Sequence, residues 1–478
     1  MTRKNLYAGV IAALFLQGGV FAENWDGGEI ASGDSVPGTL WINPDGNTPL
    51  GGIDFRMTGG EVGVNVVYSD AKSAKDTVIG GNVGYIISGG SILCTGLDSD
   101  PYSLVGTGTY GTSSDAVTTV NGDTLIRISG AGTVLNGNII AHGHGSVVNG
   151  DTSIEISGGA LLNASKAGNT ANVYAGAYGA KLNGNVSISV REATVSGCII
   201  GGGNDAGDPA YSAYVRDNVD ITIGAGAVIG DKGGVSIFGG FRKGSTGASA
   251  EYGVIGGNVN VRVSAGAKLS GDICAAGGTV NGDVNVVFEG FDSENIFSHA
   301  VKAGDNPGGT SVVLGKKTIS FVSYASETSA YSSAASGADF AGTVSGFDVI
   351  SIRDGSNVSF SQASQTFSTL EISSDSRISG GTVSAESLVV LLSEDFAAGE
   401  GTFDVGDFIA QNNITMALSQ GGLKDNFTLL GSDGSKLDVV WSDGDSVISF
   451  DNPAIPEPAF AAAFMGLAAL AFLRRKRA

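Results

Sequence analysis

The residues with the clearest chemical potential are six aspartates in near-neighbour pairs: Asp98 with Asp100, Asp205 with Asp208, and Asp443 with Asp445. Paired carboxylates can act as general acid and base on a sugar, or bind Ca²⁺. All three pairs stand in glycine- or serine-rich stretches, where aspartate is common because its side chain bonds to the turn backbone. We therefore interpret them as turn residues and predict no catalytic residue in the chain.

Histidines are the next candidate ligands. His142 and His144 flank Gly143, and His299 is the only other histidine in the sequence. No Cys-x-x-Cys or His-Glu-x-x-His pattern accompanies them, and such patterns are what place metal ligands at workable spacing. The glycine run at residues 201–203 lacks the helix and lysine context of a phosphate-binding loop. We predict no metal site and no cofactor.

The cysteines allow two interpretations. Cys94, Cys198 and Cys274 are an odd number, so one disulfide could form if the protein is exported. Cys198 and Cys274 both adjoin short apolar stretches, which favours small buried residues instead. Both alternatives stay open at the level of the sequence.

These residues belong to an internal repeat. Each copy starts with an apolar residue, then Asn or Gly, then Gly, then Asp or Asn. Clear copies begin at Val120, Val148, Leu182, Val215, Ile255 and Val280, and an earlier one at Ile79. The copy at Val215 departs from the pattern, because it reads Val-Arg-Asp-Asn. The steps between copies vary from 25 to 41 residues, so we expect insertions to be absorbed in loops.

Each start leads into a segment of alternating apolar residues, such as 186–190 or 219–223, which is typical of a strand with one buried face. A second short apolar stretch follows, as at 173–176 or 199–202. Units of 25 or 28 residues are too short for the four strands of a propeller blade, whereas stacked coils accept uneven insertions. We therefore predict an all-β fold, a right-handed parallel β-helix. We expect the Asn, Asp and Gly of the turns to adopt left-handed backbone angles.

Composition and charge exclude several classes of protein. Gly makes up 77 of 478 residues, and the charged fraction is only 15% with a positive mean hydropathy, which argues against disorder. The net charge is −21. The segments 1–22 and 459–478 contain six of the 26 basic residues and none of the 47 acidic ones, so the chain between them has a net charge near −27. Such a surface repels nucleic acid.

The C-terminal end has three parts in order. Pro456-Glu457-Pro458 comes first, an uncharged apolar run at 459–473 follows, and Arg474, Arg475, Lys476 and Arg477 close the segment. As a helix the run would reach roughly 22 Å, short of the hydrocarbon core of about 30 Å. The basic residues would stay on the cytoplasmic side, which places the rest of the chain outside. An ordinary tail anchor is the alternative interpretation.

This tripartite order resembles the PEP-CTERM sorting signal of certain Gram-negative bacteria. The family's recognition tripeptide matches Pro456, Glu457 and Pro458, and its apolar helix and basic tail match 459–473 and 474–477. The resemblance implies a membrane transpeptidase, exosortase, as a partner that cuts near the tripeptide, and transient anchoring in the inner membrane. It covers only the last twenty-three residues.

The N-terminal end agrees with export. Arg3 and Lys4 precede an apolar stretch from Leu6 to Val20, and the small residues up to Ala22 suit a signal peptidase. We predict cleavage after Ala22, with signal peptidase as the second processing partner.

The expected organisation has five parts. These are a signal peptide at 1–22, an N-terminal cap at 23–75, repeats at 76–290, an irregular continuation with a C-terminal cap at 291–455, and the sorting signal at 456–478. Strand-like alternation returns at 347–352, 357–360 and 369–372. This closing block resembles the ends of autotransporter-like passenger β-helices.

We expect a structural or adhesion protein of the cell surface, outer membrane or extracellular matrix, without enzymatic activity, for which an exopolysaccharide is a candidate partner. The first alternative is a secreted carbohydrate-active β-helix enzyme, a polysaccharide lyase or glycoside hydrolase. The second is a carbohydrate-binding module with aromatic side chains along one face, for which Tyr174, Tyr178, Tyr211 and Tyr214 are the candidates.

Overall fold

A computed structural model describes most of residues 22–452 and assigns them mainly to β-strands. The residues outside the description are 1–21, 25–26, 44–48, 71–75, 96–101, 111–115, 165, 167–168, 178, 206–212, 244–252, 291–296, 307–308, 324–336, 341, 394–398, 419–420, 443, 445 and 453–478. The chain forms two compact units. Unit 1 comprises Met1–Ser320 with Ala341–Asp348, and unit 2 comprises Phe321–Phe340 with Val349–Ala478.

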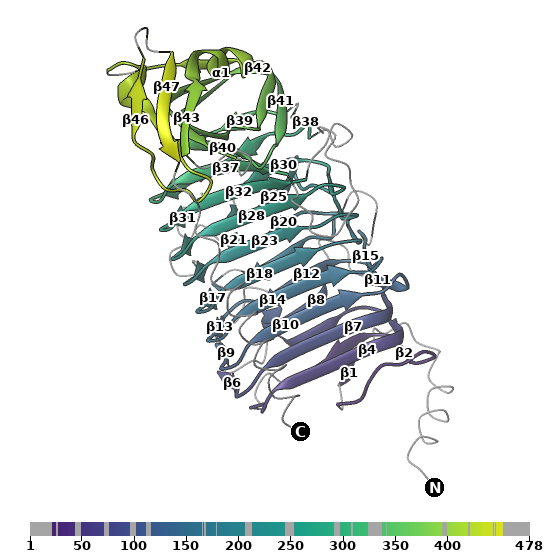
Figure 1. Cartoon of the computed structure of the whole chain (residues 1–478). Coiled ribbons are helices and arrows are strands. Elements are labelled where there is room, and N and C mark those ends of the chain that lie inside the picture. The colour runs from purple at the N-terminus through teal and green to yellow at the C-terminus, as the bar shows by residue number, and fades with distance from the viewer. Residues whose placement is uncertain are drawn as a thin grey trace, which may run out of the picture. The chain divides into compact units, whose positions relative to one another are not determined.

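Unit 1 is built from parallel sheets whose strands lie side by side in successive coils (Figure 1). The first sheet has eleven strands in the order β1 (Ala22–Asn24), β3 (Thr39–Trp41), β5 (Val66–Asp70), β8 (Tyr102–Tyr110), β12 (Asn138–His142), β16 (Val173–Gly176), β20 (Ile199–Ile200), β25 (Val235–Phe238), β30 (Asp272–Cys274), β33 (Val301–Lys302) and β39 (Val344–Ser345). A second sheet has eight short strands in the order β6 (Thr77–Ile79), β9 (Thr118–Val120), β13 (Ser146–Val148), β17 (Lys181–Leu182), β22 (Tyr214–Val215), β27 (Val254–Ile255), β31 (Thr279–Val280) and β36 (Val312–Val313).

The third sheet contains the longest strands of unit 1. It starts with β2 (Ser35–Val36), β4 (Ile53–Val62) and β7 (Val83–Ile92). After β7, a bend divides the corresponding strand into a pair of shorter strands. The long strand β7 therefore pairs with both β10 and β11 of the next coil. The pairs are β10 (Thr124–Ser129) with β11 (Thr133–Leu135), β14 (Thr152–Ser157) with β15 (Leu161–Leu162), β18 (Val186–Val190) with β19 (Thr194–Val195), β23 (Val219–Ile223) with β24 (Val228–Ile229), and β28 (Val259–Ser264) with β29 (Lys268–Leu269); β32 (Val284–Glu289) follows.

The parallel coils confirm the β-solenoid prediction in its coarse form. The alternating segments 186–190 and 219–223 are strands with the predicted bounds. The sequence pattern indicated at least two strands for each repeat, and a regular coil has four. The strands that the pattern missed have two or three residues, such as Lys181–Leu182 and Thr194–Val195, which is too short for an alternation to show.

The interior of unit 1 is filled by columns of aliphatic side chains. One column passes through six paired strands with Ile126, Ile154, Ile188, Ile221, Val261 and Val286 in register. Each of these side chains is at most 1% exposed. Burying one such side chain stabilises the fold by roughly 1.5–3 kcal/mol, so the alternation read from the sequence sets which face of the sheet points inward.

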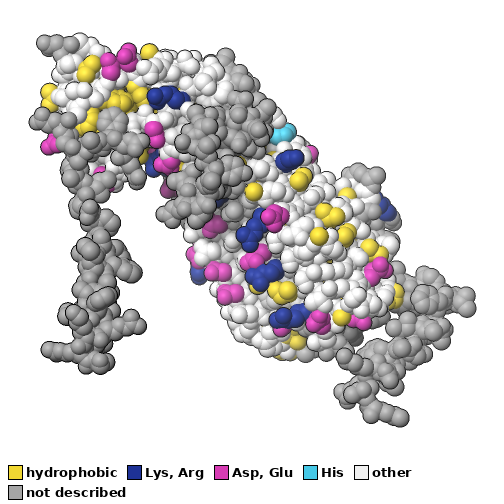
Figure 2. All heavy atoms as spheres, turned by 45° about the vertical axis from the view of Figure 1, so that its right-hand side comes forward, with side chains coloured by type: hydrophobic (Ala, Val, Ile, Leu, Met, Phe, Trp, Pro, Cys, Tyr) yellow, Lys and Arg dark blue, Asp and Glu magenta, His cyan; other side chains and the backbone are white. Residues whose placement is uncertain are grey.

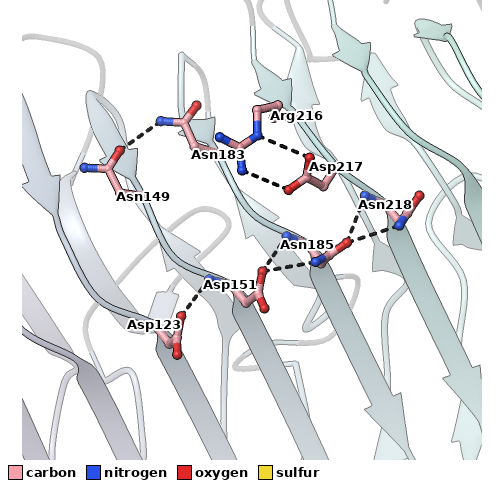
Figure 3. A network of polar contacts seen from close by, with 8 residues as sticks. All are labelled: Asp123, Asn149, Asp151, Asn183, Asn185, Arg216, Asp217 and Asn218. Carbon is pink, nitrogen blue, oxygen red and sulfur yellow. Dashed lines mark hydrogen bonds and ion pairs between the residues drawn. The ribbon is translucent and has the colours of Figure 1, made fainter.

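The Asn or Asp residues at the fourth position of the repeat starts form a ladder of side chains. The Oδ1 of each accepts a hydrogen bond from the backbone N–H of the matching residue one coil later. We name the exposed and half-buried series Asn82, Asp123, Asp151, Asn185, Asn218, Asn258 and Asp283 the turn ladder; its last oxygen accepts from Lys316. The distances are 2.8–3.2 Å, and Figure 3 shows the middle of the series. The ladder connects coils that are 25 to 41 residues apart in sequence.

The turn glycines are needed for close approach, which corrects the expectation of left-handed angles. Gly122, Gly150 and Gly282 are not among the residues with positive φ. A Cβ at any of them would lie less than 3.0 Å from the ladder oxygen of the preceding coil. Asp217 replaces this glycine in one coil, where the ladder bond from Asn218 N–H is the longest, at 3.2 Å. Left-handed angles occur instead at the bend of the third sheet, as at Gly130 with φ of 94°.

Small pairings complete unit 1. Strand β21 (Gly203–Asp205) pairs in parallel with β26 (Phe241–Lys243), and β34 (Asp305–Asn306) forms a hairpin with β35 (Gly309–Thr310). The chain passes from unit 1 to unit 2 within β37 (Lys317–Val322).

Unit 2 combines long parallel strands with an antiparallel sheet. The parallel strands are β38 (Gly337–Phe340), β40 (Val349–Arg353), β41 (Asn357–Ser373), β42 (Arg377–Leu391), β44 (Ile414–Met416) and β45 (Phe427–Leu430). The antiparallel sheet is β43 (Gly399–Asp404), β47 (Val447–Asn452) and β46 (Val439–Trp441). The helix α1 (Val405–Gln411) is capped by Asp404, and a 3₁₀ turn covers Leu423–Asn426. Segments 357–360 and 369–372, expected as separate strands, are parts of the single strand β41.

Both predicted processing segments fall almost entirely outside the described residues. Ala22, the predicted cleavage residue, is the first residue of β1. Pro456, Glu457, Pro458 and the basic residues 474–477 lie beyond the last described residue, Asn452. Within the described part of the chain, no helix is both long and apolar enough to cross a membrane.

Candidate functional site

The aspartate pairs contribute no described site. Asp98, Asp100, Asp208, Asp443 and Asp445 lie outside the described residues, and of Asp205 only the backbone, at the end of β21, is described. The interpretation of these pairs as turn residues therefore stays a prediction.

The two neighbouring histidines are buried in unit 1. His142 is fully buried, with Nδ1 2.8 Å from Thr107 Oγ1 and Nε2 2.9 Å from Thr152 Oγ1. Burial lowers the pKa of His142 to about 3, so its imidazole is neutral at physiological pH. His144 is 5% exposed. Among the described residues, no three His, Cys, Asp or Glu side chains come together as possible metal ligands.

The three cysteines are thiols and form no disulfide with one another, which answers the question left open by the sequence. All are buried, as expected for Cys198 and Cys274, which share one apolar cluster with Ile200 and Phe238. Burial raises the pKa of Cys198 to about 12 and that of Cys94 to about 11. These two thiols are therefore protonated and poorly reactive at neutral pH.

The proposed row of tyrosines is wrong for the two members that the structure describes. Tyr174 lies in β16 of the first sheet and is 3% exposed, whereas Tyr214 lies in β22 of the second sheet. They belong to different sheets and cannot form one row of exposed rings. Tyr178 and Tyr211 lie outside the described residues.

A polar surface lies on the outer face of the third sheet, across β4, β7, β10 and β14. Side chains that alternate with the buried columns point outward there, in two rows set by strand register. One row contains Asp54, Gly84, Leu125 and Ser153; the other contains Arg56, Ile86, Arg127 and Glu155. Adjacent strands are about 4.8 Å apart, so side chains within a row are close neighbours.

Two ion pairs mark this surface. Arg56 Nε lies 3.1 Å from Asp54 Oδ1, and Arg127 Nε lies 2.7 Å from Glu155 Oε2. The hydrogen bond to Glu155 raises the pKa of Arg127 above its ordinary value. The four side chains are 40–68% exposed, so each pair adds roughly 0–1 kcal/mol to stability. On the face drawn in Figure 2, basic side chains lie beside acidic ones, with hydrophobic side chains nearby.

A hollow of about 650 Å³ opens on this surface. It is lined by Gly52, Ile53, Asp54, Arg56, Asn82, Val83, Gly84, Ile86, Asp123, Leu125 and Arg127. Asn82 and Asp123 come from the turn ladder, so the same hydrogen bonds that join the coils also fix one border of the hollow. We call the hollow and its lining the sheet-face site.

No site was predicted from the sequence at Asp54, Arg56, Arg127 or Glu155. The sequence does contain one sign of this site. The outward positions of the alternating strands hold charged residues here, whereas they hold serines at 187 and 189 further along the sheet. Strand register is needed to know that these positions are adjacent. Comparisons with protein-family models, with characterised proteins and with solved structures find no match to this chain.

Proposed function

We propose that this chain is an exported structural or adhesion protein of the cell surface or extracellular matrix, delivered by an exosortase-type system. The main support is the turn ladder, because the polar residues of the repeat join one coil to the next. Such a body presents a long repetitive surface. We further propose that the coil is right-handed, as parallel crossover connections generally are.

The proposed route begins and ends with processing. Signal peptidase would cut after Ala22 and leave Glu23–Asn24 as the remainder of β1, still opposite Leu40–Trp41. Exosortase would act near Pro456-Glu457-Pro458, a few residues after β47, which ends at Asn452. Strand β47 pairs with both β43 and β46, so removal of the tail would leave this antiparallel sheet intact.

Intact-mass analysis of the native, cell-associated protein tests this proposal. The expected mass corresponds to a chain that begins at Glu23 and lacks the basic residues 474–477. The variant Glu457→Ala should retain the tail. Asp433→Ala, in a described turn of unit 2, is the matched control, because it also removes one carboxylate and should be processed normally. A native protein that keeps its tail would contradict the sorting proposal.

The carbohydrate-active enzyme remains the alternative proposal. The sheet-face site provides carboxylates and guanidinium groups on one exposed surface, which are groups that such enzymes use. Incubation of the purified protein with neutral and acidic polysaccharides separates the two proposals. New reducing ends or unsaturated sugars would favour the enzyme, and unchanged polymers would favour the structural role.

A further inference from the structure

We propose that the sheet-face site binds an uncharged glycan chain, with one sugar ring seated over Gly84. This inference rests on the proposed matrix role and names the class of partner. Three features of the site support it: the strand glycine, the paired charges and the apolar side chains between them.

Gly84 is the first observation. It is the second residue of β7 and pairs with Asp54 on one side and Leu125 on the other, a place within the sheet where glycine weakens a strand and commonly marks a close approach by a ligand or another backbone. Gly84 is not among the residues with positive φ. A Cβ built there would lie 3.5 Å from Ile53 O, an ordinary contact. Unlike the turn glycines, Gly84 is therefore not required by its surroundings, and the absence of a side chain leaves the floor of the hollow open.

The ion pairs are the second observation. A sugar hydroxyl both donates and accepts hydrogen bonds, and Asp54 with Arg56 offers an acceptor and a donor side by side. Arg127 and Glu155 offer the same two groups. Arg127 lies two strands from Arg56, which corresponds to about 10 Å at the usual spacing between strands. Two linked sugar units span such a distance. Because exposed ion pairs are weak, their partners can be exchanged for ligand hydroxyls at little cost.

The apolar and electrostatic properties select the class of glycan. Ile86 and Leu125 are half-buried neighbours of Gly84 and present aliphatic surface to the C–H face of a sugar. Arg56 and Arg127 are balanced by Asp54 and Glu155, so the site has no excess positive charge for a polyanion. The whole chain has a net charge of −21 and repels acidic polymers at long range. An uncharged, hydroxyl-rich chain meets neither obstacle.

Affinity electrophoresis of the purified full chain tests the proposal, with dextran, laminarin and mannan as neutral probes and alginate as the acidic probe. At least one neutral polymer should retard the protein, and alginate should not. Gly84→Val, which fills the floor of the hollow, should weaken this binding at least tenfold. Ser187→Val is the matched control, because Ser187 lies in the same outward row on β18, outside the hollow, and its binding should be unchanged.

A second variant covers a failure of Gly84→Val to fold, which circular dichroism would show. The double variant Asp54→Ala with Arg56→Ala removes the acceptor and the donor of one ion pair from exposed positions and should also weaken binding at least tenfold. Retardation by alginate alone, no retardation by any neutral probe, or equal binding by these variants and the wild type would each overturn the inference. The sorting proposal is read out separately by mass, so failure of one is distinguishable from failure of the other.

Discussion

Unit 1 repeats the same hydrogen bond in an exposed region and in a buried one. In the turn ladder an Oδ1 accepts from a backbone N–H one coil away, and both carboxylates and amides occur along the series. A buried ladder at the start of three strands of the first sheet repeats this contact, where Asn138 Oδ1 accepts from Asn172 N–H and Asn172 Oδ1 from Cys198 N–H. Its members are neutral and at most 1% exposed.

The difference shows how burial governs the choice of residue. In the exposed turn ladder, water can form the hydrogen bond that a backbone N–H or a side chain loses, so Asp and Asn are both acceptable there. At the buried corner a charge or an orphaned N–H is costly. In the buried ladder, the acceptor of each of these hydrogen bonds is an amide oxygen. The ladder ends at Cys198, whose Sγ also donates a hydrogen bond to Asn172 Oδ1. The same contact should therefore contribute very differently to stability at the two corners.

The largest effect is expected when a buried polar group is forced to titrate. The pKa of His142 is lowered to about 3 from 6.5 by burial. The folded state therefore disfavours the charged imidazole, and the contribution of His142 to stability is complete above pH 6.5 and is lost as the pH falls toward 3. Between pH 6.5 and 3.5 the loss is about 4 kcal/mol.

Urea unfolding of the wild type and of His142→Gln across this pH range measures the effect. The glutamine side chain cannot titrate, so the stability of the variant should fall less steeply below pH 6.5. Acidic residues titrate in both proteins, and only the difference between the two slopes reports His142. Parallel slopes would show that the imidazole is not buried in neutral form.

Next in size is the contrast between the two ladders. Asn172→Ala removes the acceptor of the buried Cys198 N–H and should lower the free energy of unfolding by about 3 kcal/mol. Asp151→Ala removes the acceptor of the exposed Asn185 N–H, which water can then satisfy, and should cost about 1 kcal/mol. Chemical denaturation of both variants under one set of conditions measures the ratio. Equal losses would mean that burial does not distinguish the ladders.

The sequence predicted the parts of unit 1 that depend on local pattern. The alternation of Val186–Val190 predicted a strand with its bounds, and the uneven repeat predicted stacked parallel coils. Contacts between coils could not be predicted, because they depend on the register of residues 25 to 41 positions apart. For the same reason the turn glycines received the wrong physical explanation. The sheet-face site was also not predicted, because the sequence does not show that Arg56 and Arg127 lie in one row on either side of β7.

The smallest of these effects tests that corrected explanation. Gly150→Ala would place a Cβ less than 3.0 Å from Asp123 Oδ1 and from the backbone of Gly122, so the coils must move apart locally. Overpacking at this exposed turn should cost about 1 kcal/mol, the lower end of the usual range, because the corner can shift toward solvent. Gly132→Ala, in the bend after β10, is the matched control, because a Cβ there would meet nothing within 4 Å and the residue is not among those with positive φ.

Thermal unfolding followed by circular dichroism should show a lower midpoint for Gly150→Ala and little change for Gly132→Ala. The comparison is sharp because both glycines lie in turns of adjacent coils and differ in what a methyl group would meet. If both positions tolerated alanine equally, close approach between coils would not be the reason for glycine in the turn. The ladder would then be looser than its 2.8–3.2 Å hydrogen bonds indicate.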